Sequence, residues 1–122
     1  MPRVLIVDDE HDLLDALCEN LELCGFDVVA SRSGNAAVEI LKKSQFDLIL
    51  SDIRMPDGDG LLLLDTVRKV NPKLPVLVFM TGFSDIAAKD CLTRGAQLVV
   101  SKPFSHDELM QALRKVLPEF SL

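Results

Sequence analysis

Several side chains that could do chemistry follow short apolar runs in this 122-residue sequence. The acidic pair Asp8-Asp9 follows one run, and Asp52, Thr81 and Lys102 each follow another. Carboxylates held close together repel one another, and a divalent cation relieves that repulsion. A ligand set made of oxygens alone is typical of Mg²⁺, whereas Zn²⁺ prefers the nitrogen and sulfur ligands that are missing from this pattern.

A carboxylate beside Mg²⁺ and a lysine can act as a nucleophile toward phosphorus. Asp52 is the best candidate, because it lies at the end of the strand that begins with the apolar residues 48–50, and a buried strand would hold it in a fixed place. Lys102 could neutralise charge on a phosphoryl group, and the Thr81 hydroxyl could donate a hydrogen bond to it. Each residue alone has an ordinary structural explanation, and the argument depends on their joint occurrence.

The apolar runs alternate with segments of helical periodicity, which predicts five strands and five helices. Short, continuously apolar strands separated by helices are typical of a parallel sheet covered on both faces. We therefore expect a three-layer α/β fold, a doubly wound (βα)5 sheet whose strand ends gather the candidate residues at one edge. Ser105 and Glu108 form a capping-box pattern at the start of the last helix, and Gly25 and Gly95 stand at expected helix ends. The predicted strands are residues 4–7, 28–30, 48–50, 76–80 and 98–100.

The composition indicates one globular domain, residues 1–122, with no output domain in the chain. A net charge of −6 argues against nucleic-acid or anionic-membrane binding. The basic pairs Lys42-Lys43, Arg68-Lys69 and Arg114-Lys115 are interpreted as solvated helix faces. Three cysteines without a CxxC pair favour packing roles in a reduced compartment, and the N-terminus lacks the features of a signal peptide, so a cytoplasmic location is expected.

The whole chain resembles the receiver domain of two-component response regulators. The motifs that carry the resemblance are VLIVDDE, LILSDIRMPDGDG, VLVFMTG and SKPF, at residues 4–10, 48–60, 76–82 and 101–104. Together they are very specific, although none would be so alone. The resemblance implies the flavodoxin-like strand order 2-1-3-4-5.

The resemblance also implies the magnesium ligands and the phosphoacceptor. Asp9 is expected to bind Mg²⁺ directly, and Asp8 largely through water. Asp52 matches the phosphoacceptor and a metal ligand, and Arg54 should contribute its backbone carbonyl.

The same resemblance assigns the switch residues. Thr81 matches the switch hydroxyl, and Lys102 matches the ammonium that pairs with Asp52 or its phosphate, with a cis bond expected before Pro103. Val99 departs from the family pattern, which has an aromatic residue there. The usual aromatic rotamer switch is therefore absent.

The implied function is phosphoacceptance in a phosphorelay, from a phosphohistidine on a sensor histidine kinase or histidine phosphotransfer protein. The domain is not an enzyme in its own right, although it assists its own phosphorylation and dephosphorylation. Phosphorylation is expected to change the face made by the fourth helix, the strand 98–100 and the last helix, which would contact a downstream effector or output domain or a second copy. We also hypothesise slow self-hydrolysis, because Phe83 could shield the phosphoryl group. Leu62 is expected to be a lone exposed leucine.

Three alternatives remain open at this point. A pseudo-receiver would act through protein contacts alone, and the missing aromatic residue keeps that possibility alive. A haloacid-dehalogenase-like phosphatase also forms an aspartyl phosphate, but it needs a second Asp where this chain has Arg54. A flavodoxin-like cofactor binder needs a phosphate loop where this chain has Asp8 and Asp9.

Overall fold

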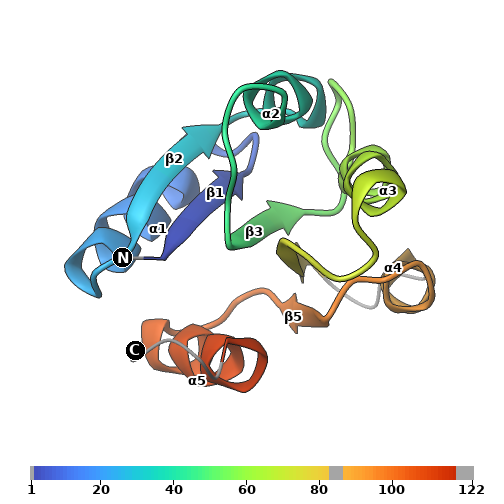
Figure 1. Ribbon diagram of the computed structural model, residues 1–122. Helices are drawn as coiled ribbons and strands as arrows, with labels where there is room; N and C mark the ends of the chain where they lie inside the picture. The colour runs from blue at the N-terminus through green and yellow to red at the C-terminus, as the bar shows by residue number, and fades with distance from the viewer. Residues whose placement is uncertain (1, 83–86, 118–122) are drawn as a thin grey trace.

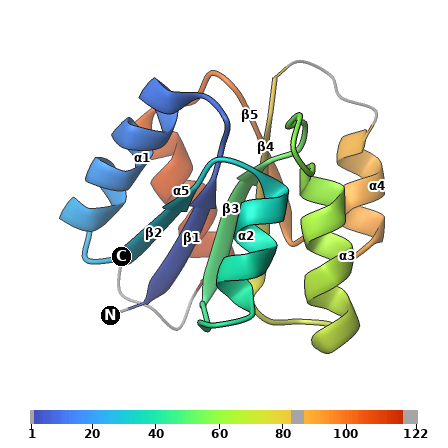
Figure 2. The ribbon, with the colours of Figure 1, turned by 90° about the horizontal axis from the view of Figure 1, so that it is seen from above.

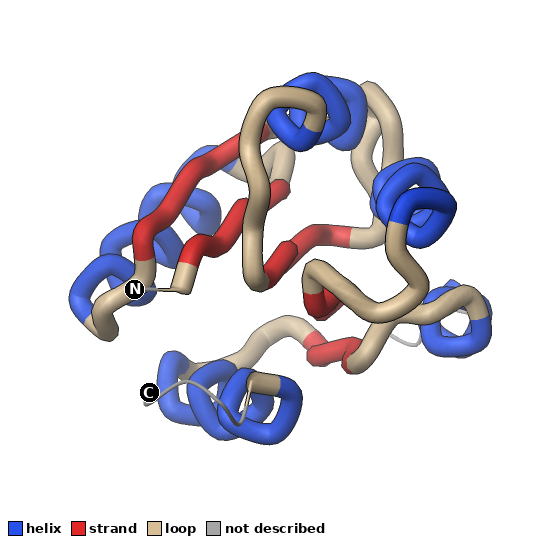
Figure 3. Tube along the Cα trace, in the orientation of Figure 1, coloured by secondary structure: helices blue, strands red, loops and turns tan. Residues whose placement is uncertain are grey.

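The computed structural model describes residues 2–82 and 87–117. Strands and helices alternate along the chain, and short loops connect them (Figure 3). The five strands are β1 (Arg3–Val7), β2 (Asp27–Ser31), β3 (Leu48–Asp52), β4 (Val76–Thr81) and β5 (Leu98–Ser101). The five helices are α1 (His11–Leu23), α2 (Gly34–Leu41), α3 (Gly60–Val70), α4 (Ala87–Thr93) and α5 (His106–Val116).

The strands form one parallel sheet with the order β2-β1-β3-β4-β5, which confirms the expected topology. Figure 1 shows α1 and α5 on one face of the sheet, and α2, α3 and α4 on the other. The chain is therefore a three-layer α/β sandwich. None of the described helices is long and apolar enough to cross a membrane.

Alternation along the strands divides the core into two clusters. Leu48 and Leu50 of β3 pack in the cluster on the α1 and α5 side, whereas Ile49 packs in the cluster on the α2, α3 and α4 side. All six residues of β4 are buried. The central strands are apolar on both faces because helices cover both faces.

The predicted helix ends are largely confirmed. Ser105 accepts a hydrogen bond from the Glu108 amide and the Glu108 carboxylate accepts one from the Ser105 amide, which completes the capping box. Gly25 and Gly95 have φ angles of +99° and +115°, the left-handed conformation that ends a helix. Lys102-Pro103 is a cis bond as expected, and Leu74-Pro75, which was not predicted, is cis as well.

Two expectations about helix faces were wrong. The helical periodicity of the sequence predicts that Leu92 lies on the apolar face of α4, but Leu92 is 48% exposed and Cys91 is buried in its place. Arg68 was assigned to a solvated face, but it is half-buried and donates to the Gly95 and Pro75 carbonyls and to Gln97 Oε1. Leu62 is 42% exposed, as expected.

Candidate functional site

The carboxyl ends of β1, β3, β4 and β5 meet at one edge of the sheet, the upper edge in Figure 2. Alternation explains which side chains meet there. Asp8 continues the pattern of Val4 and Ile6, and Asp52 continues the pattern of Leu48 and Leu50, so that both carboxylates lie toward the α1 and α5 side.

The Lys102 ammonium contacts the carboxylates of Asp8, which follows β1, and Asp52, which ends β3. Its Nζ lies 3.1 Å from Asp8 Oδ2 and 3.3 Å from Asp52 Oδ2. The Lys102 amide donates to the Thr81 carbonyl, so that the backbone after β5 is tied to the end of β4. The contact with Asp52 was expected from the sequence, whereas the contact with Asp8 was not. The contact with Asp8 could have been predicted, because β1 and β3 are parallel neighbours and a lysine that reaches Asp52 at the end of β3 also reaches Asp8 just after β1.

The three acids differ in exposure. Asp8 is fully buried, Asp52 is half-buried and Asp9 is exposed. One ligand oxygen from each can be chosen so that all lie within 4.8 Å of one another. Asp8 Oδ1 also accepts from the Glu10 amide, and Asp52 Oδ1 accepts from the Ile53 amide. Each buried carboxylate is thus oriented by a backbone donor while its other oxygen contacts Lys102.

The pKa shifts reflect burial and the close contacts between Lys102 and the two carboxylates. Burial raises the pKa of Asp52, Lys102 lowers it in part, and Asp8 raises it again. For Lys102, burial favours the neutral amine, but the carboxylates of Asp52 and Asp8 outweigh burial and raise the pKa. Both groups therefore hold protons more tightly than usual, Asp52 because burial opposes its charge and Lys102 because two carboxylates surround its ammonium. Such a site attracts cations.

An all-oxygen donor set with surplus negative charge fits Mg²⁺. Asp8, Asp9 and Asp52 are the side chains that would hold it, and the Arg54 carbonyl lies in the loop that directly follows Asp52. The residues present therefore suit the group that the sequence suggested.

The remaining site residues lie nearby in the fold. Thr81 is the buried last residue of β4, and it continues the alternation of Leu77 and Phe79 on the opposite side of the sheet from Asp52. Val99 packs against the same cluster. Phe83, invoked above for slow hydrolysis, lies outside the described residues.

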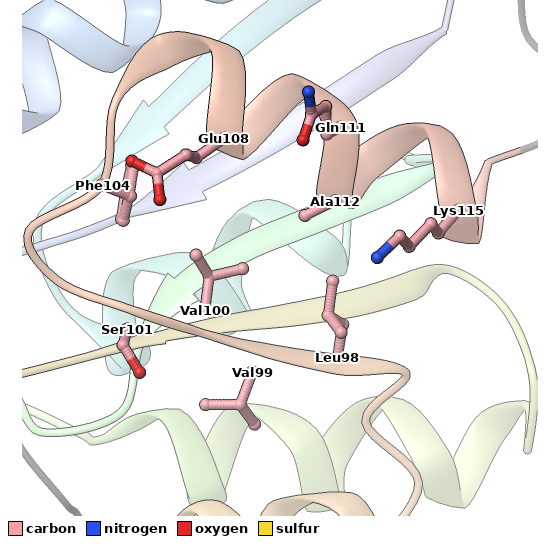
Figure 4. A pocket seen from close by; sticks show the side chains of 9 residues that line it. All are labelled: Leu98, Val99, Val100, Ser101, Phe104, Glu108, Gln111, Ala112 and Lys115. Carbon is pink, nitrogen blue, oxygen red and sulfur yellow. The ribbon is translucent and has the colours of Figure 1, made fainter.

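A surface hollow of about 360 Å³ lies between β5 and α5. Figure 4 shows Leu98 and Val100 on the side that faces α5, and Val99 on the opposite side of the strand. Charged groups flank the apolar lining. The hollow is lined by Leu98, Val99, Val100, Ser101, Phe104, Glu108, Gln111, Ala112 and Lys115.

Comparisons with known proteins agree with this geometry. The family model of the response regulator receiver domain matches residues 4–114. The chain is 37% identical over 115 residues to the C4-dicarboxylate transport transcriptional regulatory protein DctD of Rhizobium meliloti (strain 1021), covering 93% of this chain and 25% of that protein. It is 36% identical over 115 residues to the transcriptional regulatory protein ZraR of Escherichia coli (strain K12), covering 93% and 26%. The chain thus spans about a quarter of the length of these curated relatives.

Solved structures show the same fold. The beryllofluoride-activated NtrC4 receiver domain dimer has a TM-score of 0.87 and 30% identity, with 99% of this chain and 100% of that chain covered. NtrX from Brucella abortus has a TM-score of 0.89 and 29% identity, with 97% and 28% covered. These similarities favour a receiver over the phosphatase and flavodoxin-like alternatives. The chain belongs to the family of response regulator receiver domains, the phosphoacceptor modules of two-component signalling.

Proposed function

We propose that this receiver accepts a phosphoryl group on Asp52, with help from Lys102, Thr81 and a Mg²⁺ ion. The observation that carries the proposal is the cluster at the sheet edge, where the oxygens of Asp8, Asp9 and Asp52 approach within 4.8 Å and Lys102 bridges two of them. Asp52 is the acid best suited to attack, because it is held at the end of a buried strand and is still partly open to solvent.

The donor is a phosphohistidine on a sensor histidine kinase or a histidine phosphotransfer protein. An O–P bond forms from an Asp52 carboxylate oxygen as the P–N bond of the phosphohistidine breaks. The imidazole, already protonated on its other nitrogen, leaves as a neutral ring. Phosphoryl transfer depends mainly on positioning and on charge neutralisation, and the surrounding residues provide both.

Each of the other residues has one role. Asp9, Asp8, Asp52 and the Arg54 carbonyl would hold Mg²⁺, directly or through water. When bound, the metal neutralises charge on the transferring phosphoryl oxygens. Lys102 pairs with the new phosphate, as it already pairs with Asp52.

The output is a change on the face made by α4, β5 and α5. A phosphoryl group at Asp52 draws in the Thr81 hydroxyl, and the backbone of Thr81 is bonded to Lys102 just after β5. With Val99 in the usual aromatic position, the hollow between β5 and α5 and the exposed Leu92 are the features that a partner would meet. We assign this face to contact with a downstream effector, an output domain or a second copy, in the cytoplasm.

The test is intact-protein mass after incubation with MgCl₂ and an acyl phosphate donor such as acetyl phosphate. The native chain should gain one phosphate, and Asp52→Asn should gain none. Asp12→Asn, which alters an exposed acid at the start of α1, should behave as the native chain does.

Two results would contradict the proposal. Phosphate on Asp52→Asn would move the acceptor elsewhere. The absence of both an adduct and Mg²⁺ binding in the native chain would indicate a pseudo-receiver that acts through contacts alone.

A further inference from the structure

The N-terminus of α2 forms hydrogen bonds with the loop between β3 and α3, which is the loop that carries Arg54. The Gly34 amide donates to the Gly58 carbonyl at 2.7 Å, and the Asn35 amide donates to the Asp57 carbonyl at 3.2 Å. Asn35 Nδ2 also donates to Asp57 Oδ1 at 2.9 Å. The first amides of a helix have no partner within the helix, so these bonds use donors that α2 leaves free.

Two glycines allow this close approach. A Cβ on Gly34 would collide with the Gly58 carbonyl, and a Cβ on Gly58 would lie only 2.6 Å from the Asn35 amide nitrogen. Gly58 also has a φ angle of +80°, which residues with a side chain rarely adopt. The sequence thus places glycine on both sides of one contact, and we call Gly34, Asn35, Asp57 and Gly58 the α2 clasp.

The loop is held at its base by other bonds. The Ile53 amide donates to the Met80 carbonyl, and the Gly60 amide donates to the Ile53 carbonyl at 2.7 Å. These bonds fix both ends of the loop against β3 and β4. The clasp holds the loop further out, three residues beyond Arg54. The position of the Arg54 carbonyl therefore depends on both the base and the clasp.

We propose that the α2 clasp is a positioning device for the magnesium site, which holds the β3–α3 loop that carries the Arg54 carbonyl beside Asp52. This inference rests on the proposed function, since it concerns the same metal. The clasp residues touch neither the metal nor the phosphoryl group. They act on the affinity for Mg²⁺ and leave the chemistry at Asp52 unchanged once the metal is bound.

The test is titration of the uniformly ¹⁵N-labelled chain with MgCl₂, following the backbone amide signals of Asp52, Ile53 and Arg54. Asn35→Ala removes the side-chain bond and should raise the Kd for Mg²⁺ roughly threefold. Gly58→Ala opens the clasp and should raise it roughly tenfold, in the range found when groups that orient metal ligands are removed. Phosphorylation by acetyl phosphate should return to the native rate at saturating Mg²⁺.

Two control variants separate positioning from stability and charge. Gly25→Ala strains another glycine of positive φ, with no atom within 4 Å of the new Cβ, at the far end of α1. It should lower the melting temperature and leave the Kd for Mg²⁺ unchanged. Asp57→Asn keeps an oxygen that can accept from Asn35 while it removes the charge, and should stay within twofold of the native Kd.

The outcomes are distinct. A native chain without Mg²⁺-dependent shifts would overturn the proposed function and this inference with it. A native chain that binds Mg²⁺, together with Asn35→Ala and Gly58→Ala variants of unchanged Kd, would overturn this inference alone. A slow phosphorylation rate that persists at saturating Mg²⁺ would also overturn it, because the clasp would then act on the chemistry.

Discussion

Lys102 is the residue on which the charge of the site depends. It contacts the fully buried Asp8 and the half-buried Asp52, and it is the cation that the structure places against them. Its single ammonium is shared between these two close carboxylates. Removing the Lys102 ammonium would leave the buried Asp8 carboxylate without its partner. Removing one partner of a buried ion pair destabilises a fold more than replacing both partners with apolar residues.

We expect Lys102→Met to reduce the rate of phosphorylation by acetyl phosphate roughly 100-fold, the usual effect of losing one charge-stabilising donor. Binding of Mg²⁺ should persist, because the ligands are untouched. Intact-protein mass against time measures the rate. Lys69→Met, which alters an exposed lysine on α3, is the control. A Lys102→Met rate within threefold of the native rate would contradict this role.

The raised pKa of Asp52 predicts a dependence of stability on pH. The folded chain binds the Asp52 proton more tightly than the unfolded chain does. The free energy of unfolding therefore falls as pH rises from the ordinary carboxyl pKa, about 4, through the raised value in the folded state. Asn cannot titrate and loses nothing over this window.

In magnesium-free buffer, Asp52→Asn should thus melt at a higher temperature than the native chain at pH 7. The difference should shrink as the pH approaches 4. Thermal unfolding followed by far-ultraviolet circular dichroism measures both values. A difference that stays constant or grows on acidification would show that burial of the Asp52 charge is not its cause.

Arg68 connects α3 to the segments that precede β4 and β5. Its guanidinium lies beside the loop before β4 and the turn after α4, where it donates three hydrogen bonds. Gln97 continues the network, since its Oε1 also accepts from the Leu77 amide and its Nε2 donates to the Lys73 carbonyl. Burial lowers the pKa of Arg68. The residue therefore joins α3, β4 and the approach to β5.

Arg68→Met should lower the free energy of unfolding by about 2 kcal/mol, because two carbonyls and one amide oxygen lose a charged donor. Lys69→Met, on the exposed side of the same helix, should change it by less than about 0.5 kcal/mol. Urea denaturation of both variants measures the values. Equal changes in the free energy of unfolding for Arg68→Met and Lys69→Met would mean that the Arg68 hydrogen bonds add nothing to stability.

The elements show how far the sequence could be interpreted. Periodicity and capping signals predicted the strands and the Ser105–Glu108 capping box, because both depend on neighbours in the chain, whereas the strand order came from the resemblance to receiver domains. Arg68, the Asp8–Lys102 pair and the α2 clasp depend on residues 7 to 94 positions apart, and most of these contacts join residues at least 22 positions apart. Leu92 and Cys91 are adjacent, and the packing of α4 decided which of them is buried. Long-range packing therefore explains what was missed.

At the scale of the whole molecule, Mg²⁺ should stabilise the fold, since it binds a site that only the folded chain assembles. With free Mg²⁺ tenfold above Kd, the gain is about 1.4 kcal/mol. The melting temperature should rise by several degrees relative to NaCl of equal ionic strength. Asp9→Asn, which removes an exposed ligand, should reduce the rise. An equal rise with NaCl would indicate general screening of the net charge of −6.

The strand order β2-β1-β3-β4-β5 also bears on how the domain is made. Each strand after the first pairs with one that has already been synthesised, and from β3 onward every strand joins the same growing edge. After β1, no strand therefore has to wait for a later segment of the chain before its pairing partner exists. Asp8 and Asp52 are brought together first, and Lys102 arrives with the last strand. The order of synthesis therefore places both carboxylates in the chain before the ammonium that pairs with them.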